Sequence, residues 1–300
     1  MEKLSIFDKM KTSSHPYAIT TSILWSLAYV LTRSCTQILT PFQTGFLRLF
    51  VASVFMIILI IIKKIPFPKG KDLGYFIASG LFGFALYMLF FNKGCSMVTT
   101  ATGNVLLASA TIITAVGARI LFHEKLSWLQ WAGTFIAFAG VILLACIGGA
   151  FSVNRGMLWL FLAVLVLSAY NLLQRYLGRM HDSLSITAWS ILFGTIFLSV
   201  LAPSSFRSAV TAPPRVLICL LILGTCCSGI AYLSWSKAFA LAKRASSVSN
   251  YACLNPFISA IFGFLFIGDP VEPSAIYGGG VIMLGLLLYN FAPAILEKRI

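Results

Sequence analysis

Apolar residues fill long stretches of this chain, and polar residues are concentrated in the short segments between them. A helix that crosses a bilayer needs roughly 20 mainly apolar residues. The stretches that satisfy this requirement are 17–38, 42–62, 73–91, 97–122, 127–147, 156–177, 184–201, 216–236, 245–267 and 273–291. The pattern therefore predicts ten transmembrane helices. The longest connection, Ala202–Arg215, contains three prolines and is predicted to be a loop.

Landmarks in the first half of the chain recur in the second half at a spacing of 145 residues. The aligned pairs are His123-Glu124 with Gly268-Asp269, Gly133 with Gly278, Gly140 with Gly285, and Thr111 with Pro256. A repeat of this size determines the architecture of the whole chain. We therefore predict two five-helix repeats, residues 1–148 and 149–300. Because five is odd, the second repeat enters the membrane from the opposite side. The expected fold class is an all-α membrane protein with ten transmembrane helices in two inverted five-helix repeats.

Composition supports lipid as the solvent of most of the chain. Of its 300 residues, 59% are hydrophobic and only 10% are charged, against about 25% charged in an ordinary soluble domain. The net charge of +14 does not indicate nucleic-acid binding, because no soluble domain with a basic face is visible. The expected partners are therefore the lipid bilayer and a small molecule.

The distribution of basic residues predicts the orientation in the membrane. If both termini are cytoplasmic, sixteen of the 22 Lys and Arg lie on the cytoplasmic side. The opposite side then holds five, which are Arg33, Lys93, Arg155, Arg207 and Arg215. Since Lys and Arg accumulate in cytoplasmic loops, we expect both termini to be cytoplasmic.

Pro256 is the most informative single residue, because it is a proline in the middle of an apolar stretch. A proline inside a helix frees the carbonyl four residues earlier, here that of Ala252, and a free carbonyl in a membrane must face protein, water or substrate. Inverted repeats place a substrate site near the bilayer midplane. With Asn250, Tyr251 and Asn255 nearby, we interpret Pro256 as a substrate contact at a kinked helix. The alternative is a kink that only shapes packing.

Polar aromatic residues and one further asparagine form a second candidate set. Buried Tyr and Trp require hydrogen-bond partners, and a zwitterionic or aromatic ligand would supply them. The candidates are Trp25, Tyr29, Tyr87, Tyr170, Asn171, Tyr232 and Trp235. The alternative is that they anchor the protein at the membrane interface, and Trp235 lies near a helix end.

Arg48 is the one basic residue expected inside a helix. It follows Pro41 by seven residues, which places it about 10 Å deep at 1.5 Å per residue. A charge inside the membrane suggests a functional role. Two interpretations stay open, a contact with a substrate carboxylate and a structural anchor bonded to backbone carbonyls.

None of the eight acidic residues falls within an apolar stretch. Proton-driven pumps commonly place an ionisable Asp, Glu or His inside the helix bundle. Their absence here favours a neutral or zwitterionic substrate that moves by facilitated diffusion, or by coupling through groups that the sequence does not identify, and argues against a pump for small cations. Glu124 and Asp269 precede the fifth and tenth stretches, where we expect them to stabilise helix N-termini.

No enzymatic, metal or cofactor site is expected. His123-Glu124 could begin a zinc motif, but the second histidine required four residues after the first is replaced by Ser127. The paired glycines lie seven residues apart and hence on one helix face, where small residues permit close packing. We expect them to form seams within the bundle, with a dimer contact as the alternative, so the chain is expected to be a monomer or a homodimer.

The order and spacing of several short motifs identify a family. These motifs are Leu24-Trp25, Thr40-Pro41, Arg48, His123-Glu124, Trp235-Ser236-Lys237-Ala238, Asn255-Pro256 and Gly268-Asp269. With them the chain resembles the drug/metabolite transporter superfamily and, within it, the ten-helix EamA-type permeases. The resemblance implies an exporter or permease for amino acids or related small metabolites in a bacterial inner (plasma) membrane. Similar proteins also suggest an alternative, an antiporter for phosphorylated or nucleotide-linked metabolites.

Overall fold

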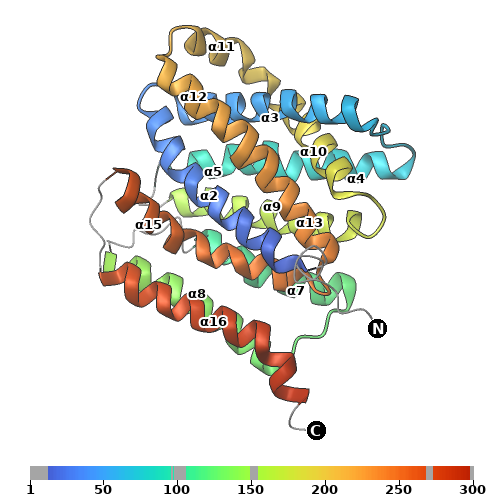
Figure 1. The fold of residues 1–300 in the computed structure, drawn as a ribbon, viewed down its shortest axis with the longest axis vertical. Helices are drawn as coiled ribbons and strands as arrows, with labels where there is room; N and C mark the ends of the chain where they lie inside the picture. Colours follow the sequence, from blue (N-terminus) through green and yellow to red (C-terminus); the bar gives the residue numbers. More distant parts are fainter. Residues whose placement is uncertain (1–12, 96, 98–105, 149–154, 268–272, 298–300) are drawn as a thin grey trace, which may run out of the picture. The chain divides into compact units, whose positions relative to one another are not determined.

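The described part of the chain is helical throughout. The computed structural model describes residues 13–95, 97, 106–148, 155–267 and 273–297, and within these ranges it contains helices and no β-strand (Figure 1). Every predicted stretch contains at least one helix. In the described residues, six helices are long and apolar enough to cross a membrane, and three shorter helices are also apolar. The all-α prediction is confirmed, whereas the number of ten spans stays a prediction.

The chain divides into two compact units, and each combines segments from both halves of the sequence. Unit 1 consists of residues 1–85 and 173–243, and unit 2 consists of residues 86–172 and 244–300. These units are defined by which residues pack together, whereas the predicted repeats, 1–148 and 149–300, are defined by landmarks that recur along the sequence. The repeats therefore stay a prediction.

Unit 1 is built from helices of the first three and the seventh and eighth stretches. They are α2 (Ser14–Thr36), α3 (Pro41–Lys63), α4 (Lys71–Gly80), η1 (Leu81–Leu86, at the unit boundary), α10 (Ser183–Leu198), η2 (Ser199–Leu201), α11 (Ala202–Val210), α12 (Pro214–Ile222), η3 (Leu223–Ile230) and α13 (Ala231–Leu241). Helix α2 packs against α13, and α10 packs against α3, α4 and α13.

Unit 2 contains the remaining helices. They are α5 (Tyr87–Cys95), α7 (Ala110–Phe122), α8 (Trp128–Gly148), α14 (Ala245–Ser249), η4 (Asn250–Cys253), α15 (Leu254–Ile267), α16 (Pro273–Glu297) and most of α9 (Arg155–Leu177), whose last turn belongs to unit 1. Helix α16 packs along α8, and α14 packs against α7.

Two helix starts follow directly from local sequence. At α3, the Thr40 hydroxyl accepts the Gln43 N–H while the Gln43 side chain accepts the Thr40 N–H, and Pro41 occupies the first turn. Ser127 and Gln130 make the same reciprocal pair of bonds before α8. This capping box satisfies donors that a helix start otherwise leaves unpaired, so the Thr40-Pro41 motif specifies where α3 begins.

Unit 1 contains two π-helices at corresponding positions of the third and eighth stretches. They are η1 and η3. A π-helix is rare and often marks a functional site. Gly224 lets η3 approach α3 closely, because a Cβ at this position would lie 2.4 Å from the Val51 Cβ and 2.9 Å from the Arg48 carbonyl oxygen. A larger residue would push η3 away from the turn that carries Arg48.

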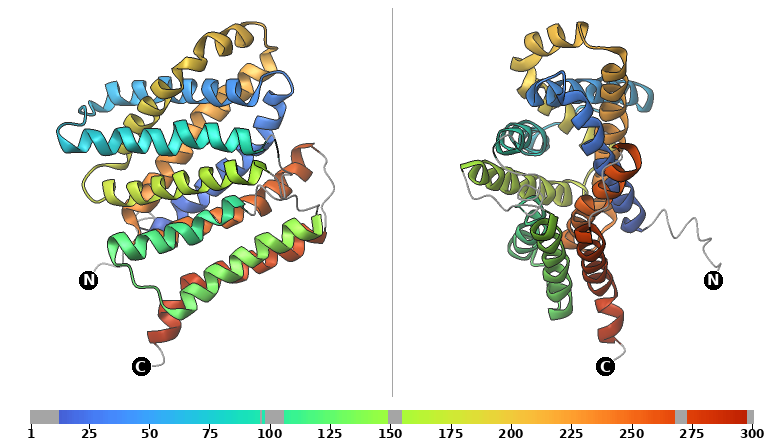
Figure 2. Two further views of the ribbon diagram at one scale, coloured as in Figure 1. Left: turned by 180° about the vertical axis from the view of Figure 1, so that it is seen from behind. Right: turned by 90° about the vertical axis from the view of Figure 1, so that its left-hand side faces the viewer.

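Glycines bring α8 and α16 together in unit 2, where the two helices run side by side and antiparallel (Figure 2). A Cβ at Gly133 would lie 2.7 Å from the Gly285 carbonyl oxygen, and a Cβ at Gly140 would lie 2.8 Å from that of Gly278. The prediction of an intra-bundle glycine seam is thus confirmed. A shift of 145 residues converts one contact pair into the other, as expected for helices related by a two-fold axis.

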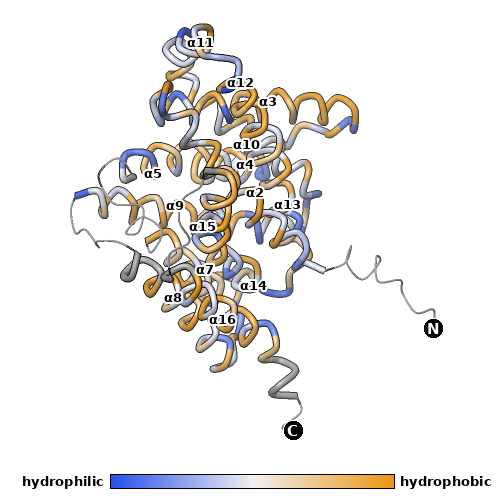
Figure 3. Tube along the Cα trace, turned by 60° about the vertical axis from the view of Figure 1, so that its left-hand side comes forward, coloured by the Kyte–Doolittle hydropathy of each residue, from blue (hydrophilic) through white to orange (hydrophobic). Residues whose placement is uncertain are grey.

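Apolar residues follow one another along the longer helices, as the orange colour of α3 shows (Figure 3), and some of their side chains are exposed. On α3, Ile61 and Ile62 are 70% and 65% exposed. Such exposure would be costly in water, and it is what a lipid-facing surface requires.

The segment after α10 contains a helix that the sequence reasoning missed. Ala202–Val210 forms α11, with Pro203 in its first turn. Phe206 packs edge-on against Phe50 and Phe46, with ring centroids 4.9 and 5.7 Å apart. The prediction of a loop over the whole of Ala202–Arg215 was wrong, because proline is well tolerated at a helix start.

Candidate functional site

The structure gathers three predicted aromatic residues in one cluster of unit 1. The Trp25 ring on α2 lies 5.1 Å from the Tyr232 ring and 4.9 Å from the Trp235 ring, both on α13. Phe84 and Phe239 extend the cluster, at 4.6 Å from Tyr232 and 5.3 Å from Trp235. Sequence reasoning missed these two residues, because nothing distinguishes them from the other phenylalanines of the chain.

The members of this aromatic cluster differ in how much of each side chain is exposed. Tyr232 and Trp235 are only 4% and 1% exposed, so Trp235 does not serve as an interfacial anchor, the alternative considered for it. Trp25 is partly exposed, but its indole Nε1 is buried and has no acceptor among the described residues. The cluster therefore combines buried, packed aromatic rings with one hydrogen-bond donor, the Trp25 Nε1, that has no acceptor among the described residues.

Arg48 lies on α3 beside the π-helix η3. Its Nε donates to the Ser228 hydroxyl at 2.9 Å, and Ser228 is fully buried. The anchor is therefore a serine hydroxyl rather than the backbone carbonyls that one interpretation expected.

A buried polar network in unit 1 joins α4, α10, α13 and the end of α9. Gln174 donates to the Ser79 hydroxyl at 3.1 Å and accepts from the Ser236 hydroxyl at 2.6 Å, and Ser190 donates to Ser79 at 2.9 Å. All four residues are fully buried. Sequence reasoning missed this network, although a glutamine within an apolar stretch is itself a signal of a buried partner.

Arg175 is a second buried polar residue of unit 1 with several hydrogen bonds. It is one of the sixteen basic residues counted on the cytoplasmic side, and it is only 7% exposed. Its guanidinium group donates to the backbone carbonyls of Phe239, Ala242 and Lys243, at the end of α13. Phe239 lies in the last turn of α13, where carbonyls have no partner within the helix, and Ala242 and Lys243 directly follow this helix, so Arg175 caps α13.

In unit 2 three predicted residues bond to residues that the sequence reasoning did not select. The Asn250 amide donates to Thr134 at 3.0 Å, and the Asn171 amide donates to Thr114 at 3.3 Å. The Tyr251 hydroxyl accepts from Asn290 at 3.3 Å. These bonds connect buried polar groups of α7, α8, α9, η4 and α16, and they show a structural role for each predicted residue.

Pro256 occupies a different helical context from the one expected. The stretch is interrupted by the 3-10 helix η4, and Pro256 lies in the first turn of α15, which begins at Leu254. The Ala252 carbonyl, which we expected to be free, accepts the Leu254 N–H. The kink therefore takes the form of a discontinuous helix, and proline is compatible with its first turn.

Thr111, the residue aligned with Pro256, bonds back to the preceding turn of the chain. Its hydroxyl donates to the Ala108 carbonyl one turn earlier, at 2.9 Å. The Cys253 thiol lies 4.0 Å from the same hydroxyl. The corresponding segments of the two halves, on α7 and η4, thus contact each other in unit 2.

Three further predicted site residues lie on helices of unit 2. Tyr170 is fully buried in unit 2, and Tyr87 stacks on Phe91 with ring centroids 5.4 Å apart. Asn255 is partly exposed. The Tyr29 side chain, and Asp269 in the tenth-helix prediction, lie outside the described residues.

Glu124 caps a helix, but not the one that follows it in sequence. Both of its carboxylate oxygens accept the Ala245 N–H at the start of α14, at 3.1 and 2.9 Å. The start of α8, which we had assigned to Glu124, is capped by Ser127 and Gln130 instead. Arg244, next to Ala245, donates to the Gln130 side chain, so this part of unit 2 is joined by charge-assisted bonds.

Replacing Glu124 tests this cap. We expect Glu124→Ala to lower the free energy of unfolding by about 1–3 kcal/mol, because it leaves the buried Ala245 N–H without an acceptor. Glu124→Gln keeps one side-chain acceptor and should cost less than half as much. The check is a titration with sodium dodecyl sulfate in mixed micelles. Equal losses for the two variants would contradict the assigned role.

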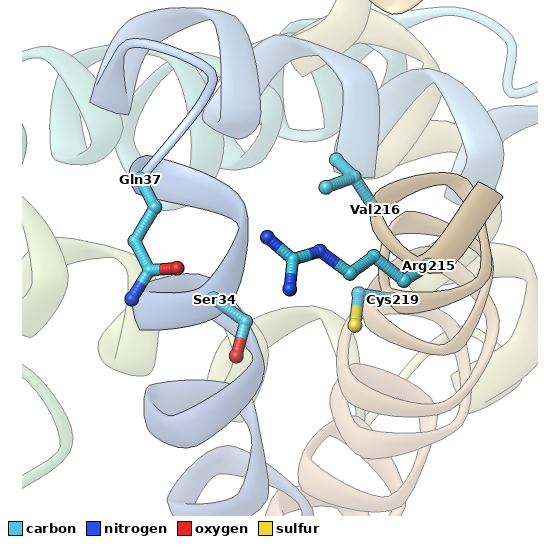
Figure 4. A pocket seen from close by; sticks show the side chains of 5 residues that line it. All are labelled: Ser34, Gln37, Arg215, Val216 and Cys219. Atoms are coloured by element: carbon cyan, nitrogen blue, oxygen red, sulfur yellow. The ribbon is translucent and has the colours of Figure 1, made fainter. Parts of the chain in front are cut away.

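A small cavity lies where α2 ends and α12 begins (Figure 4). It measures about 130 Å³ and is lined by Ser34, Gln37, Arg215, Val216 and Cys219. The Arg215 side chain reaches across it towards α2 (Figure 4). None of the predicted site residues lines this cavity, which lies at the helix ends of unit 1.

The chemistry available around the aromatic cluster and the buried polar networks is hydrogen bonding, aromatic contact and the charge of Arg48. The charges of Arg175 and Glu124 bind backbone groups instead. No group of three His, Cys, Asp or Glu in these residues could hold a metal ion. Hydroxyls, amides, aromatic rings and a guanidinium group suit the recognition of a small polar or anionic solute.

Comparisons with known proteins identify the family. The model of the EamA-like transporter family matches residues 12–146 and 154–291. A protein of Streptantibioticus cattleyicolor named probable terminal-alkyne amino-acid exporter is 26% identical over 94% of this chain and 95% of its own length. The uncharacterized transporter YdfC of Bacillus subtilis is 26% identical over 89% of this chain and 87% of its own length.

A solved crystal structure of a protein has the same fold, with a TM-score of 0.78 and 16% identity over 93% of this chain and 98% of its own length. The apolar helices and the two family matches together make the chain an integral membrane protein. It belongs to the EamA-like transporter family.

Proposed function

We propose that this protein is a secondary transporter or facilitator for small neutral or zwitterionic metabolites, amino acids or their relatives. It works by alternating access, with ten transmembrane helices in two inverted five-helix repeats, in a bacterial inner membrane with both termini cytoplasmic. The observation that carries the proposal is the match of both halves of the chain to a transporter family. The similar protein named as an amino-acid exporter supports the substrate class.

Three structural features support the mechanism. The π-helices η1 and η3 occupy corresponding stretches of the two halves. A shift of 145 residues converts one glycine contact between α8 and α16 into the other. The 3-10 turn η4 before Pro256 lies inside one membrane-length helix, and a 3-10 stretch in the middle of a helix often marks a functional hinge.

Transport in proteoliposomes tests the proposal. We expect saturable uptake of at least one labelled amino acid from a panel of aromatic, hydroxylated and sulphur-containing members, without any pH gradient. Empty liposomes control for leakage. Uptake only with a pH gradient would contradict facilitation, and uptake of phosphorylated metabolites but of no amino acid would favour the antiporter alternative. Cysteines added at each terminus and labelled from outside cells would test the orientation.

A further inference from the structure

We propose that Arg48 and Thr44 on α3 form a carboxylate-binding site, held in position by Ser228. The inference rests on the proposed function only in taking the carboxylate to belong to the transported metabolite. It deepens that function, because it restricts the substrate to compounds that bear a carboxylate group.

The first argument is the charge of Arg48 in its surroundings. The residue lies within a membrane-length helix, where an uncompensated charge is costly. The two acidic residues that the structure describes in unit 1 are used elsewhere, since Asp72 bonds His181 at 3.1 Å and Asp182 accepts the Leu184 N–H at 2.9 Å. Within the described part of unit 1, Arg48 therefore has no acidic partner.

The second argument is the geometry of the guanidinium group. The bond to Ser228 uses Nε alone, and the two terminal nitrogens have no acceptor among the residues that the structure describes. Two parallel terminal N–H groups match the two oxygens of a carboxylate. Ser228 is fully buried, and its position on η3 is supported by the close contact at Gly224. Ser228 is therefore a positioning residue for the guanidinium group.

The third argument is a second unused donor on the same face of α3. Thr44 precedes Arg48 by four residues, so their side chains lie one above the other. Thr44 is 1% exposed, and its hydroxyl has no partner among the described residues. A buried hydroxyl without a partner is uncommon. An anion bound at Arg48 would give it an acceptor to which it can donate.

The aromatic cluster indicates what accompanies the carboxylate. Ser228, the partner of Arg48, precedes Tyr232 by four residues, and the Tyr232 ring contacts Trp25 and Phe84. Trp25, the partly exposed member of the cluster, offers an apolar surface to the rest of the solute. The site therefore suits an organic carboxylate with an apolar or aromatic body better than inorganic phosphate.

Binding in nanodiscs of phosphatidylcholine tests the site with two matched probes, phenylacetate and phenylacetamide, which differ in the carboxylate. We expect phenylacetate, but not phenylacetamide, to raise the unfolding temperature of the wild-type protein. Arg48→Gln should weaken phenylacetate binding on the order of 10- to 100-fold, as for loss of a hydrogen bond to a charged group. Arg207→Gln, on the exposed surface of α11, should leave binding unchanged.

Two further variants separate binding from positioning. Thr44→Val keeps the shape of the side chain and should weaken phenylacetate binding several-fold. Ser228→Ala should also weaken it, yet preserve the preference for phenylacetate over phenylacetamide, since the charge remains. Equal binding of both probes to the wild-type protein, or an unchanged affinity in Arg48→Gln, would overturn the proposal.

The outcomes also separate this inference from the proposed function and from lipid binding. If amino acids are transported but Arg48→Gln does not affect phenylacetate binding, the inference fails and the proposed function stands. If phenylacetate binds through Arg48 but no amino acid is transported, the site stands and the proposed function fails. Stabilisation by phosphatidylglycerol that depends on Arg48, without any difference between the two probes, would assign the anion to lipid and overturn the inference.

Discussion

Gly285→Val is expected to lower the free energy of unfolding by about 3 kcal/mol, at the upper end of the cost of overpacking. A Cβ at Gly285 would lie 2.3 Å from the Ala137 backbone nitrogen and 2.6 Å from the Gly133 carbonyl oxygen. Both atoms belong to the backbone of α8, so they cannot rotate away. The variant must separate α8 from α16 along the glycine seam.

Gly280→Val on the same helix is the matched control for this prediction. A Cβ at Gly280 would meet nothing within 4 Å, so this variant should change the free energy of unfolding by less than about 0.5 kcal/mol, as surface substitutions do. Unfolding by sodium dodecyl sulfate in mixed micelles measures both variants. Similar losses at the two positions would show that the seam does not hold unit 2 together.

Arg175→Met should destabilise the protein by about 3 kcal/mol, because it removes charged donors from backbone carbonyls. The carbonyls of Phe239, Ala242 and Lys243 would lose this cap at the end of α13. Methionine retains much of the aliphatic packing, so the loss reports the hydrogen bonds.

Arg179→Met serves as the control for Arg175→Met. Arg179 is exposed and lies four residues after Arg175 in the chain. This variant should be close to neutral in the same unfolding measurement. Arg175→Lys should recover only part of the loss, because an ammonium group cannot reproduce the fork of guanidinium donors. A neutral Arg175→Met would contradict the capping role.

Local patterns identified the elements of this protein well. The apolar stretches indicate where helices form, since lipid requires each backbone group to bond within its own segment. Thr40-Pro41 predicts the start of α3 through its own capping box, and the spacing of Gly133 and Gly140 predicts a close helix contact. Each of these features depends on residues within one or two helical turns.

The hydrogen-bond partners that side chains find on distant helices could not be predicted from the sequence. Glu124 was assigned to the adjacent helix, but it caps α14, which lies 121 residues further along the chain. Gln174 received no role, although it bonds residues of α4 and α13. A polar side chain within an apolar stretch signals that a partner exists, but the sequence alone does not say which helix provides it.

By itself the sequence determined that this protein is helical, membrane-embedded and built on recurring glycine and proline landmarks. These properties follow from the solvent that surrounds each segment and from local backbone chemistry. Only the tertiary structure decided that η4 interrupts the stretch before Pro256, that Trp235 is buried, and that Arg48 is anchored by Ser228 with its terminal nitrogens unused. These outcomes depend on which helices pack together, because a buried polar group can be satisfied by any neighbour that the fold brings within hydrogen-bonding distance.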